Sequence, residues 1–265
     1  MSRILITGAG SYIGTSFEKY IKELNSDYVV DTVDMIDKSW KEKDFSLYDV
    51  VFHVAGIAHI KEDESNKDLY YKVNHKLAVE TAKKAKEEGV KQFIFLSSMS
   101  VYGMETGIIT KNTVPQPISN YGKSKLMAEQ DMEKLRDSNF KVAIVRPPMI
   151  YGEGCKGNYN SLVKFAKVMP LFPYIDNQRS MLHIDNLNIY IKKLIDDESD
   201  GLYFPQDEEY VCTSEMVKDI ANEQGKEIKL TKVLNGFVYL AQKMPGKIGK
   251  MANKAFGDLI YSKND

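Results

Sequence analysis

The sequence predicts an α/β fold with a doubly wound, mostly parallel sheet, and two observations support this class. Over roughly the first 150 residues, short apolar runs alternate with segments whose apolar residues recur at helical spacing. A glycine-rich turn at residues 7–14 directly follows the first apolar run, as at the end of a buried parallel strand. Strands separated by helices form βαβ units whose strands pair in parallel, so the alternation indicates the fold class.

Each element of this first part is indicated by its own local signals. Apolar residues recur at helical spacing from Ile13 to Leu24, and Gly89 suits the C′ position at the end of a later helix. Pro147 and Pro148 stop the last strand, because proline lacks the N–H that a sheet needs. The predicted elements are strands at residues 4–6, 28–35, 50–55, 92–96 and 142–145, and helices at residues 13–24, 69–85 and 121–135.

A second, smaller lobe is expected to begin near residue 150, where glycine, proline and asparagine become denser. Shorter helices are predicted there at residues 161–168, 186–195 and 214–222. Earlier in the chain, residues 34–49 leave little room for a full strand, helix and strand, so one crossover helix should be reduced or absent. The predicted division is a first domain at residues 1–150, re-entered around 181–200, and a small C-terminal α/β lobe at 151–265.

The composition narrows the class of protein. The 265 residues include 36 lysines and arginines against 37 acids, so no global field attracts nucleic acid phosphates. Cys155 and Cys212 form no CxxC motif or Cys/His cluster, which argues against a disulfide framework or a zinc site and fits a reducing compartment. No apolar run approaches the roughly 18–20 residues of a membrane span. We therefore expect a soluble, cytoplasmic protein with no transmembrane segment, no nucleic acid partner and no metal.

One segment near the C-terminus is strongly basic, although the net charge of the chain is close to zero. Residues 226–254 hold seven lysines and one acid, with Phe237, Val238, Leu240 and Ala241 between them. The favoured interpretation is a solvated helical face, and the alternative is a basic amphipathic helix that touches a membrane surface.

The histidines are interpreted by their context. His53 lies within a predicted strand and is expected to be a packed core residue, and His183 is expected to be structural. His59 lies in a predicted loop, where exposure is the commoner outcome and contact with a substrate is the alternative.

The turn at residues 7–14 suits the pyrophosphate of a dinucleotide, which makes the predicted fold Rossmann-type. Glycines let the backbone approach the phosphates closely, and the helix N-terminus offers free N–H groups and a partial positive charge. Gly14 is small enough for tight packing of the helix on the sheet, whereas Ser11 stands where a glycine is common. The Ser11 side chain either tightens the turn or donates to a phosphate.

An acid about 20 residues past the glycines commonly bonds the adenosine ribose. Asp34 lies 20 residues after Gly14, and Asp37 is the second candidate. Because no arginine stands between Tyr28 and Trp40 to pair with a 2′-phosphate, NAD is favoured over NADP as the cofactor, with NADP left open.

Three residues form a candidate catalytic set. Ser98 follows a predicted buried strand, at the sheet edge where ligands bind in open α/β sheets. Tyr121 and Lys125 are four residues apart and share a helix face. The lysine charge favours the phenolate of the tyrosine, which then takes a proton from a sugar hydroxyl while Ser98 positions the same oxygen.

Taken in this order, these motifs resemble the extended short-chain dehydrogenase/reductase family, and specifically its NAD-dependent epimerase/dehydratase type. The resemblance covers roughly residues 3–190. It implies a first domain that binds NAD(P), a smaller lobe that binds substrate, and a homodimer. The cofactor contacts that it implies are Gly8, Gly10, Ser11, Tyr12, Ile13, Gly14, Asp34, Asp44, Phe45, Val54, Ala55, Gly56, Asn74, Ser97, Tyr121, Lys125 and Pro148. The implied substrate contacts are Ser98, Met149, Asn158 and Arg179.

The resemblance implies a nucleotide-sugar 4-epimerase, with a UDP-sugar as the expected substrate. A reductase of a nucleotide-linked 4-keto sugar uses the same residues in one direction and is the first alternative. A non-catalytic NAD(P)-binding sensor is the second alternative, although such proteins usually lose the tyrosine or the lysine. The family's dehydratases carry an Asp-Glu pair where this chain has Met99 and Ser100, so dehydration is not expected.

Overall fold

The computed structural model describes residues 2–24, 27–58, 62–63, 65–155 and 157–263. The chain divides into two compact units. Unit 1 comprises Met1–Gly103, Pro115–Pro148 and His183–Pro205. Unit 2 comprises Met104–Val114, Met149–Leu182 and Gln206–Asp265.

Unit 1 contains a six-stranded parallel sheet in the order β10-β6-β4-β3-β1-β2. The predicted fold class is thereby confirmed. The register places Thr7 beside His53 and His53 beside Phe95, so the ends of β1, β3 and β4 meet at one edge. The strands are β1 (Ser2–Thr7), β2 (Tyr28–Val33), β3 (Val50–His53), β4 (Gln92–Leu96), β6 (Lys141–Val145) and β10 (Gly201–Tyr203).

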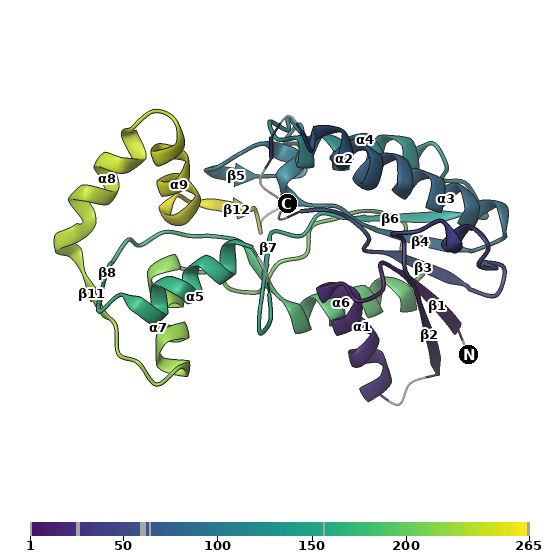
Figure 1. Cartoon of the computed structure of the whole chain (residues 1–265), viewed down its shortest axis with the longest axis horizontal. Coiled ribbons are helices and arrows are strands. Elements are labelled where there is room, and N and C mark those ends of the chain that lie inside the picture. The colour runs from purple at the N-terminus through teal and green to yellow at the C-terminus, as the bar shows by residue number, and fades with distance from the viewer. Residues whose placement is uncertain (1, 25–26, 59–61, 64, 156, 264–265) are drawn as a thin grey trace. The chain divides into compact units, whose positions relative to one another are not determined.

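Helices cover both faces of this sheet, as a doubly wound fold requires (Figure 1). One face carries α1 (Tyr12–Glu23) and α6 (Ile184–Asp196), which the Asn188 side chain joins by donating to Ser16 Oγ over 2.8 Å. The other face carries α2 (Lys67–Tyr70), the π-helical turn η2 (Tyr71–Leu77), α3 (Ala78–Glu87) and α4 (Asn120–Glu133).

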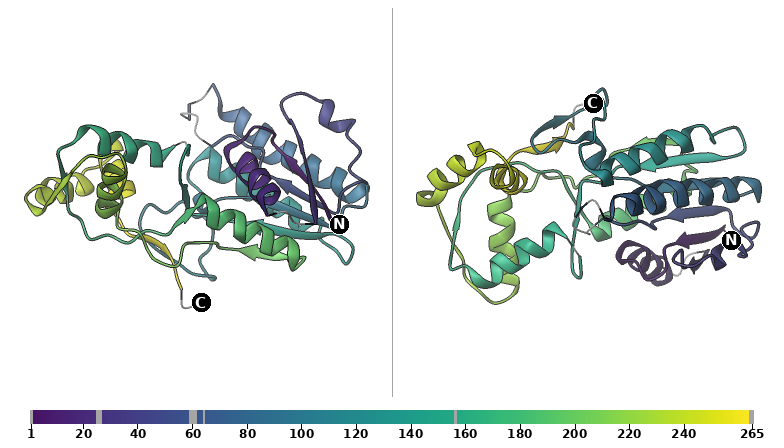
Figure 2. Two further views of the ribbon diagram at one scale, coloured as in Figure 1. Left: turned by 90° about the horizontal axis from the view of Figure 1, so that it is seen from below. Right: turned by 45° about the horizontal axis from the view of Figure 1, so that its top comes forward.

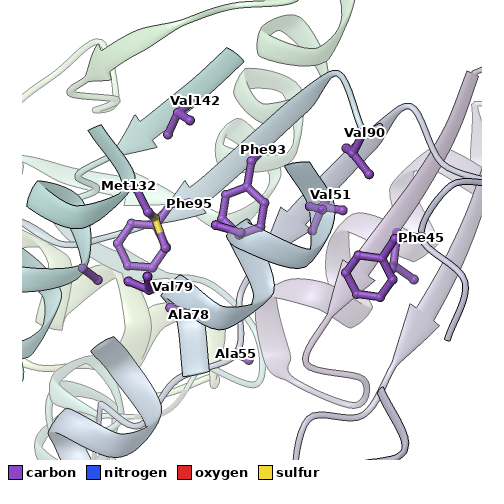
Figure 3. Close-up of a cluster of buried hydrophobic side chains, with 14 of the residues drawn as sticks. Phe45, Val51, Ala55, Ala78, Val79, Val90, Phe93, Phe95, Met132 and Val142 are labelled. Atoms are coloured by element: carbon purple, nitrogen blue, oxygen red, sulfur yellow. The ribbon is translucent and has the colours of Figure 1, made fainter. Parts of the chain in front are cut away.

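A hydrophobic core fills the space between the sheet and α3 and α4. Phe93 and Phe95 are two residues apart on β4, so both rings point to the same face of the sheet. They pack there with Met132 of α4 and Ala78 of α3 (Figure 3). All four side chains are fully buried.

Two features of unit 1 bear on the expectations from sequence. The crossover between β2 and β3 holds only the short 3₁₀ turn η1 (Ser39–Lys41), which confirms the reduced helix. The long helix ends as predicted, with Gly89 at a φ of 82°. It is not one regular α-helix, however, because η2 interrupts it with a π-helical segment.

Unit 2 is built around a smaller core. The helices α5 (Asn158–Val168) and α7 (Thr213–Glu223) pack together through Leu162, Ala166 and Val217. Its strand pairs are β5 (Gly107–Ile109) with β12 (Leu259–Tyr261), β8 (Leu171–Pro173) with β11 (Lys229–Thr231), and β7 (Met149–Tyr151) with β9 (Met181–His183). Residues 104–114, which the sequence placed in the first domain, belong to unit 2 because β5 pairs with β12.

The basic stretch at residues 226–254 is not a single helix. It holds β11, the 3₁₀ turn η4 (Lys232–Leu234), α8 (Asn235–Lys243) and most of α9 (Lys247–Phe256). The break follows Pro245, and Gly246 there has a φ of 77° that glycine adopts readily. The helices α8 and α9 pack against one another (Figure 2). No helix in the described part of the chain is both long and apolar enough to cross a lipid bilayer.

Candidate active site

The glycine-rich turn links β1 to α1 with a backbone that only glycine allows. Gly8 has a φ of 107°, and a Cβ atom built there would lie 2.9 Å from the Ala55 backbone nitrogen. Gly10 has a φ of 72° and open space beside it. The turn is therefore a backbone cradle ahead of a helix N-terminus, and its shape fits a pyrophosphate.

Ser11 has a structural role in this cradle. It is the N-cap of α1, and its Oγ accepts a hydrogen bond from the Gly14 N–H over 3.2 Å. The side chain thus tightens the turn, which was the first of the two sequence interpretations. A Cβ on Gly14 would lie 3.1 Å from Ile6 Cγ2, so α1 packs as closely on the sheet as predicted. Tyr12 and Ile13 follow as the half-buried first residues of α1.

The segment after β3 forms the adjoining wall. Val54 donates its N–H to the Thr7 carbonyl over 3.1 Å, and Ala55 is buried. A Cβ on Gly56 would lie 3.0 Å from Asn74 Oδ1 and 3.3 Å from Lys125 Nζ. Predicted cofactor residues far apart in the sequence therefore lie together here.

Asn74 braces this wall from inside the π-helical turn η2. Its Oδ1 accepts the Ile57 N–H over 2.8 Å, and its Nδ2 donates to the Ile57 carbonyl over 2.9 Å. Because Asn74 is fully buried and uses both ends of its amide, it fixes the backbone beside Gly56.

The residues predicted to meet the adenosine lie on two loops. Asp34 is exposed directly after β2, and its Oδ1 accepts the Ile36 N–H over 2.9 Å. Asp44 is also exposed, and its Oδ1 accepts hydrogen bonds from the N–H and the hydroxyl of Ser46. The Phe45 ring is fully buried in the unit 1 core, so its side chain supports the loop from beneath. These cofactor contacts stay predictions.

Ser98 and Tyr121 are brought together at the carboxyl end of β4. Ser98 is the N-cap of the 3₁₀ turn η3 (Met99–Tyr102), and its Oγ accepts the Ser100 N–H over 3.1 Å. Burial raises the pKa of Tyr121, and a hydrogen bond with the Ser98 hydroxyl partly opposes that rise. The phenol therefore holds its proton unless a further positive charge favours the phenolate.

Lys125 supplies a positive charge one helical turn after Tyr121. It is only 4% exposed, its Nζ donates to the Leu96 carbonyl over 2.8 Å, and it lies 4.6 Å from the Phe95 ring centroid. Burial lowers the pKa of Lys125 to about 8, while the Glu129 carboxylate opposes the shift. The ammonium form is thus still the main form at pH 7.

A buried ion pair supports the helix that carries these residues. The Glu129 carboxylate accepts from Arg146 Nε over 3.1 Å and from Arg146 Nη2 over 2.5 Å, and both side chains are nearly inaccessible. Ser97, a predicted cofactor contact, donates its hydroxyl to Glu129, and Tyr102 accepts from Arg146 Nη1. Sequence reasoning missed this pair. The one local signal for it was the position of Glu129, four residues after Lys125 and therefore on the same face of α4.

A second missed residue holds the start of α4. The Glu62 carboxylate accepts the N–H groups of Asn120 and Tyr121, each over 3.0 Å. Ser119 is the N-cap of the same helix and accepts from the Gly122 N–H. Glu62 therefore ties the loop after β3 to the backbone of Tyr121. His59, proposed from sequence in the same loop, lies outside the described residues.

His53 is a packed core residue, as predicted. It is fully buried against Phe93 and Phe95, and its Nδ1 shares a 2.7 Å hydrogen bond with Thr7 Oγ1. Burial, with a smaller contribution from the Lys125 charge, lowers the pKa of His53 to about 3. His183 is structural too, because it caps α6 by accepting the Asp185 N–H.

The predicted substrate residues outside the catalytic set belong to unit 2. Met149 begins β7 and is half-buried, and Asn158 begins α5. Arg179 donates through Nη1 to the Gly257 carbonyl over 2.8 Å, and burial lowers its pKa. Part of its guanidinium is therefore engaged at the end of α9, and its diphosphate contact stays a prediction. Pro148, which closes the unit 1 segment, is buried.

Comparison with known proteins connects this geometry to a family. Residues 4–187 match the model of the NAD dependent epimerase/dehydratase family. The chain is 32% identical over 249 residues to a UDP-glucose 4-epimerase of Vibrio cholerae, covering 82% of this chain and 74% of that one. It is 27% identical over 245 residues to the N-acetyl-alpha-D-glucosaminyl-diphospho-ditrans,octacis-undecaprenol 4-epimerase of Escherichia coli O157:H7, covering 85% and 73%.

Solved structures share the fold. A dTDP-4-dehydrorhamnose reductase from Bacillus anthracis in complex with NADP has a TM-score of 0.74 at 21% identity, covering 100% of this chain and 91% of that one. A UDP-glucuronic acid 4-epimerase from Bacillus cereus in complex with NAD has a TM-score of 0.69 at 20% identity, covering 96% of both.

Proposed function

Since the chain belongs to the NAD dependent epimerase/dehydratase family and is an NAD(P)-dependent enzyme, we propose that it is an NAD-dependent 4-epimerase of a nucleotide sugar. The observation that carries this proposal is the set of Ser98, Tyr121 and Lys125 at the carboxyl end of β4, in the same unit as the glycine cradle. UDP is the proposed nucleotide, because the Vibrio cholerae relative is a UDP-glucose 4-epimerase.

The chain's own residues divide the work between binding and proton transfer. The cradle at Gly8 and Gly10 holds the cofactor pyrophosphate, Asp34 the adenosine ribose, and Lys125 the nicotinamide ribose. When bound, NAD supplies a hydride acceptor for the sugar C4 position and a donor for its return. Met149, Asn158 and Arg179 are the proposed contacts of the nucleotide sugar in unit 2.

Tyr121 acts as the base and then as the acid. As the phenolate, its oxygen takes the proton of the sugar 4-hydroxyl, and the phenol so formed later gives that proton back to the epimerised oxygen. The Lys125 ammonium, one helical turn after Tyr121, supplies a positive charge that favours the phenolate form, and Ser98 donates a hydrogen bond that positions the sugar oxygen. Met99 and Ser100 supply no acid for eliminating water, so the reaction ends at epimerisation.

A reductase of a nucleotide-linked 4-keto sugar is the competing function. Tyr121 donates a proton as readily as it accepts one, so the catalytic set serves reduction in one direction. The two functions differ in whether the cofactor stays on the protein between turnovers.

The test is to purify the protein, identify any co-purified dinucleotide by mass spectrometry after gel filtration, and assay without added cofactor. We expect stoichiometric NAD and interconversion of UDP-glucose with UDP-galactose, or of their N-acetylated forms. Tyr121→Phe should keep NAD and lose the activity. Loss of absorbance at 340 nm with a 4-keto sugar and NAD(P)H, without epimerisation, would establish the reductase. A wild-type protein that binds NAD(P) but shows neither activity would favour the sensor.

We further propose that the protein works in the cytoplasm as a homodimer. Neither Cys155 nor Cys212 is joined in a disulfide in the described part of the chain, which suits a reducing compartment. Sedimentation equilibrium tests the dimer, since a mass that stays at 30.2 kDa across concentrations would exclude it.

A further inference from the structure

Unit 2 exposes a run of large apolar side chains on η4, α8 and α9, here called the α8–α9 surface (residues 232–256). Val233 is 83% exposed, Phe237 73%, Leu240 64% and Met251 70%. Met244 and Ile248 are exposed between them. No residue of α8 is buried, and Gly249 is the only buried one of α9 among the described residues. Single exposed apolar residues are ordinary, but several of them on two short helices that pack together are typical of a binding surface.

The apolar residues follow the helix period. Phe237, Leu240 and Met244 are spaced by three and four residues, and Val233 lies one turn before them. Phe237 and Leu240 therefore share a face of α8, with Val233 on η4 just before the helix and Met244 just after its end. Ile248 and Met251 are three residues apart and share a face of α9. Because α8 and α9 pack against each other, the two faces belong to one hairpin (Figures 1 and 2).

The charges on this surface are of one sign. Residues 232–257 contain five lysines and no acid, although the whole chain has a net charge of −1. Lys247, Lys250 and Lys254 are spaced by three and four residues, so they form a stripe of their own along α9. On a helical wheel this stripe lies directly beside Ile248 and Met251.

The hairpin is fixed to the rest of unit 2 at its far end. The Phe256 ring packs 5.7 Å from Phe172, a residue of the unit 2 core. Arg179 donates to the Gly257 carbonyl just past α9. The end of α9 is therefore attached to the core of unit 2, while the apolar side chains of the α8–α9 surface stay exposed.

We propose that the α8–α9 surface docks on the surface of an anionic lipid bilayer. The acyl boundary of a bilayer accepts Phe237, Leu240 and Met251, while its phosphate groups pair with the lysines beside them. A second copy of this chain is a poorer occupant, because its own lysine stripe would meet lysines. The proposal does not depend on the proposed function, since it concerns where unit 2 binds and not which reaction unit 1 performs.

Vesicle co-sedimentation of the full chain tests the proposal. The probes are vesicles of phosphatidylcholine with phosphatidylglycerol and vesicles of phosphatidylcholine alone. We expect binding to the anionic vesicles, about tenfold or more tighter than to the neutral ones, and weakened by salt. Combining Phe237→Ser with Leu240→Ser should remove the binding, and combining Lys247→Glu with Lys250→Glu should weaken it at least about tenfold.

Two matched variants serve as controls. Ile189→Ser removes an apolar side chain that is 53% exposed on α6, and Lys218→Glu reverses an exposed charge on α7. Both should bind like the wild type. The proposal is overturned if the wild type ignores anionic vesicles or if the controls weaken binding as much as the test variants do. It is also overturned if sedimentation equilibrium shows a dimer that Phe237→Ser dissociates while no vesicle binding occurs.

Discussion

Lys125 carries its charge in a position with almost no water, and that placement has a thermodynamic cost. An unfolded lysine titrates near pH 10.4, whereas burial lowers the pKa of Lys125 to about 8 in the folded chain. Between these values the unfolded state binds the extra proton. Stability should therefore rise with pH through this window and is penalised below pH 8.

This penalty can be measured against Lys125→Met. From pH 8 to pH 10, the unfolding free energy of the wild type should rise relative to that of the variant, by up to about 3 kcal/mol. Guanidinium titrations of both proteins at each pH provide the comparison. Parallel curves across this range would mean that Lys125 does not titrate with a lowered pKa.

His53 makes a pH prediction of the same sign, on the acid side. Its folded pKa of about 3 lies below the usual value near 6.5, so below pH 6.5 the unfolded state binds a proton that the folded state refuses. Stability should fall by about 1.4 kcal/mol per pH unit on this account. His53→Asn should lose stability less steeply between pH 6.5 and 4.5, measured by chemical unfolding. An equally steep loss would assign the acid sensitivity to other groups.

At the scale of the element, α4 carries Tyr121 and Lys125, and the ion pair of Glu129 with Arg146 joins this helix to the end of β6. Glu129→Gln leaves Arg146 buried without its counter-charge, which should lower the unfolding free energy by about 3–5 kcal/mol. Glu133→Gln, at the exposed end of the same helix, should change it by less than about 1 kcal/mol. Replacing Glu129 and Arg146 together by methionine should recover much of the loss. A Glu129→Gln protein as stable as Glu133→Gln would show that the ion pair is dispensable.

Glu62 holds the first turn of the same helix by accepting backbone N–H groups there. Glu62→Ala removes the acceptor for the Tyr121 N–H, and we expect about 1 kcal/mol of lost stability with a several-fold lower kcat and a smaller change in KM. Glu62→Gln keeps an oxygen acceptor and should recover part of kcat. Steady-state kinetics of the two variants measures this positioning role, and an unchanged kcat in Glu62→Ala would refute it.

The sequence predicted the elements of unit 1 well because their ends carry local signals. Residues such as Gly89 and Pro147 mark where a helix or strand stops, so the predicted bounds lie within a few residues of the observed ones. The π-helical turn was missed because Asn74 is fixed by Ile57, 17 residues away. The split between α8 and α9 did carry a local signal in Pro245 and Gly246, and the basic stretch was nevertheless treated as one helix.

The site shows the same division between local and distant causes. Tyr121 and Lys125 were found because four residues is one helical turn. Glu62 and Arg146 were missed because their partners lie 59 and 17 residues away, and nothing in the local sequence shows which strand or loop will face α4. Phe45 fits a motif, and yet its ring lies in the core, because the motif does not show which way the ring points.

At the scale of the whole molecule, the net charge of −1 conceals two different arrangements of positive charge, one buried and one exposed. At the candidate site of unit 1, positive charge comes from the buried Lys125 and from the N-terminus of α1, beside the glycine cradle. Unit 2 gathers exposed lysines around apolar side chains on the α8–α9 surface. The first suits a phosphate-bearing cofactor, and the second is proposed to suit an anionic bilayer.

The central claim is that the hydride removed from the sugar C4 position returns to the same molecule. UDP-glucose and UDP-N-acetylglucosamine, each with deuterium at C4, should be incubated with the purified protein without added cofactor, and the products examined by mass spectrometry and NMR. The account predicts that one of the two sugars yields its C4 epimer with the deuterium still at C4 and no net change at 340 nm. Loss of the deuterium from C4, or product that forms only when NAD(P)H is added and consumed, would contradict it.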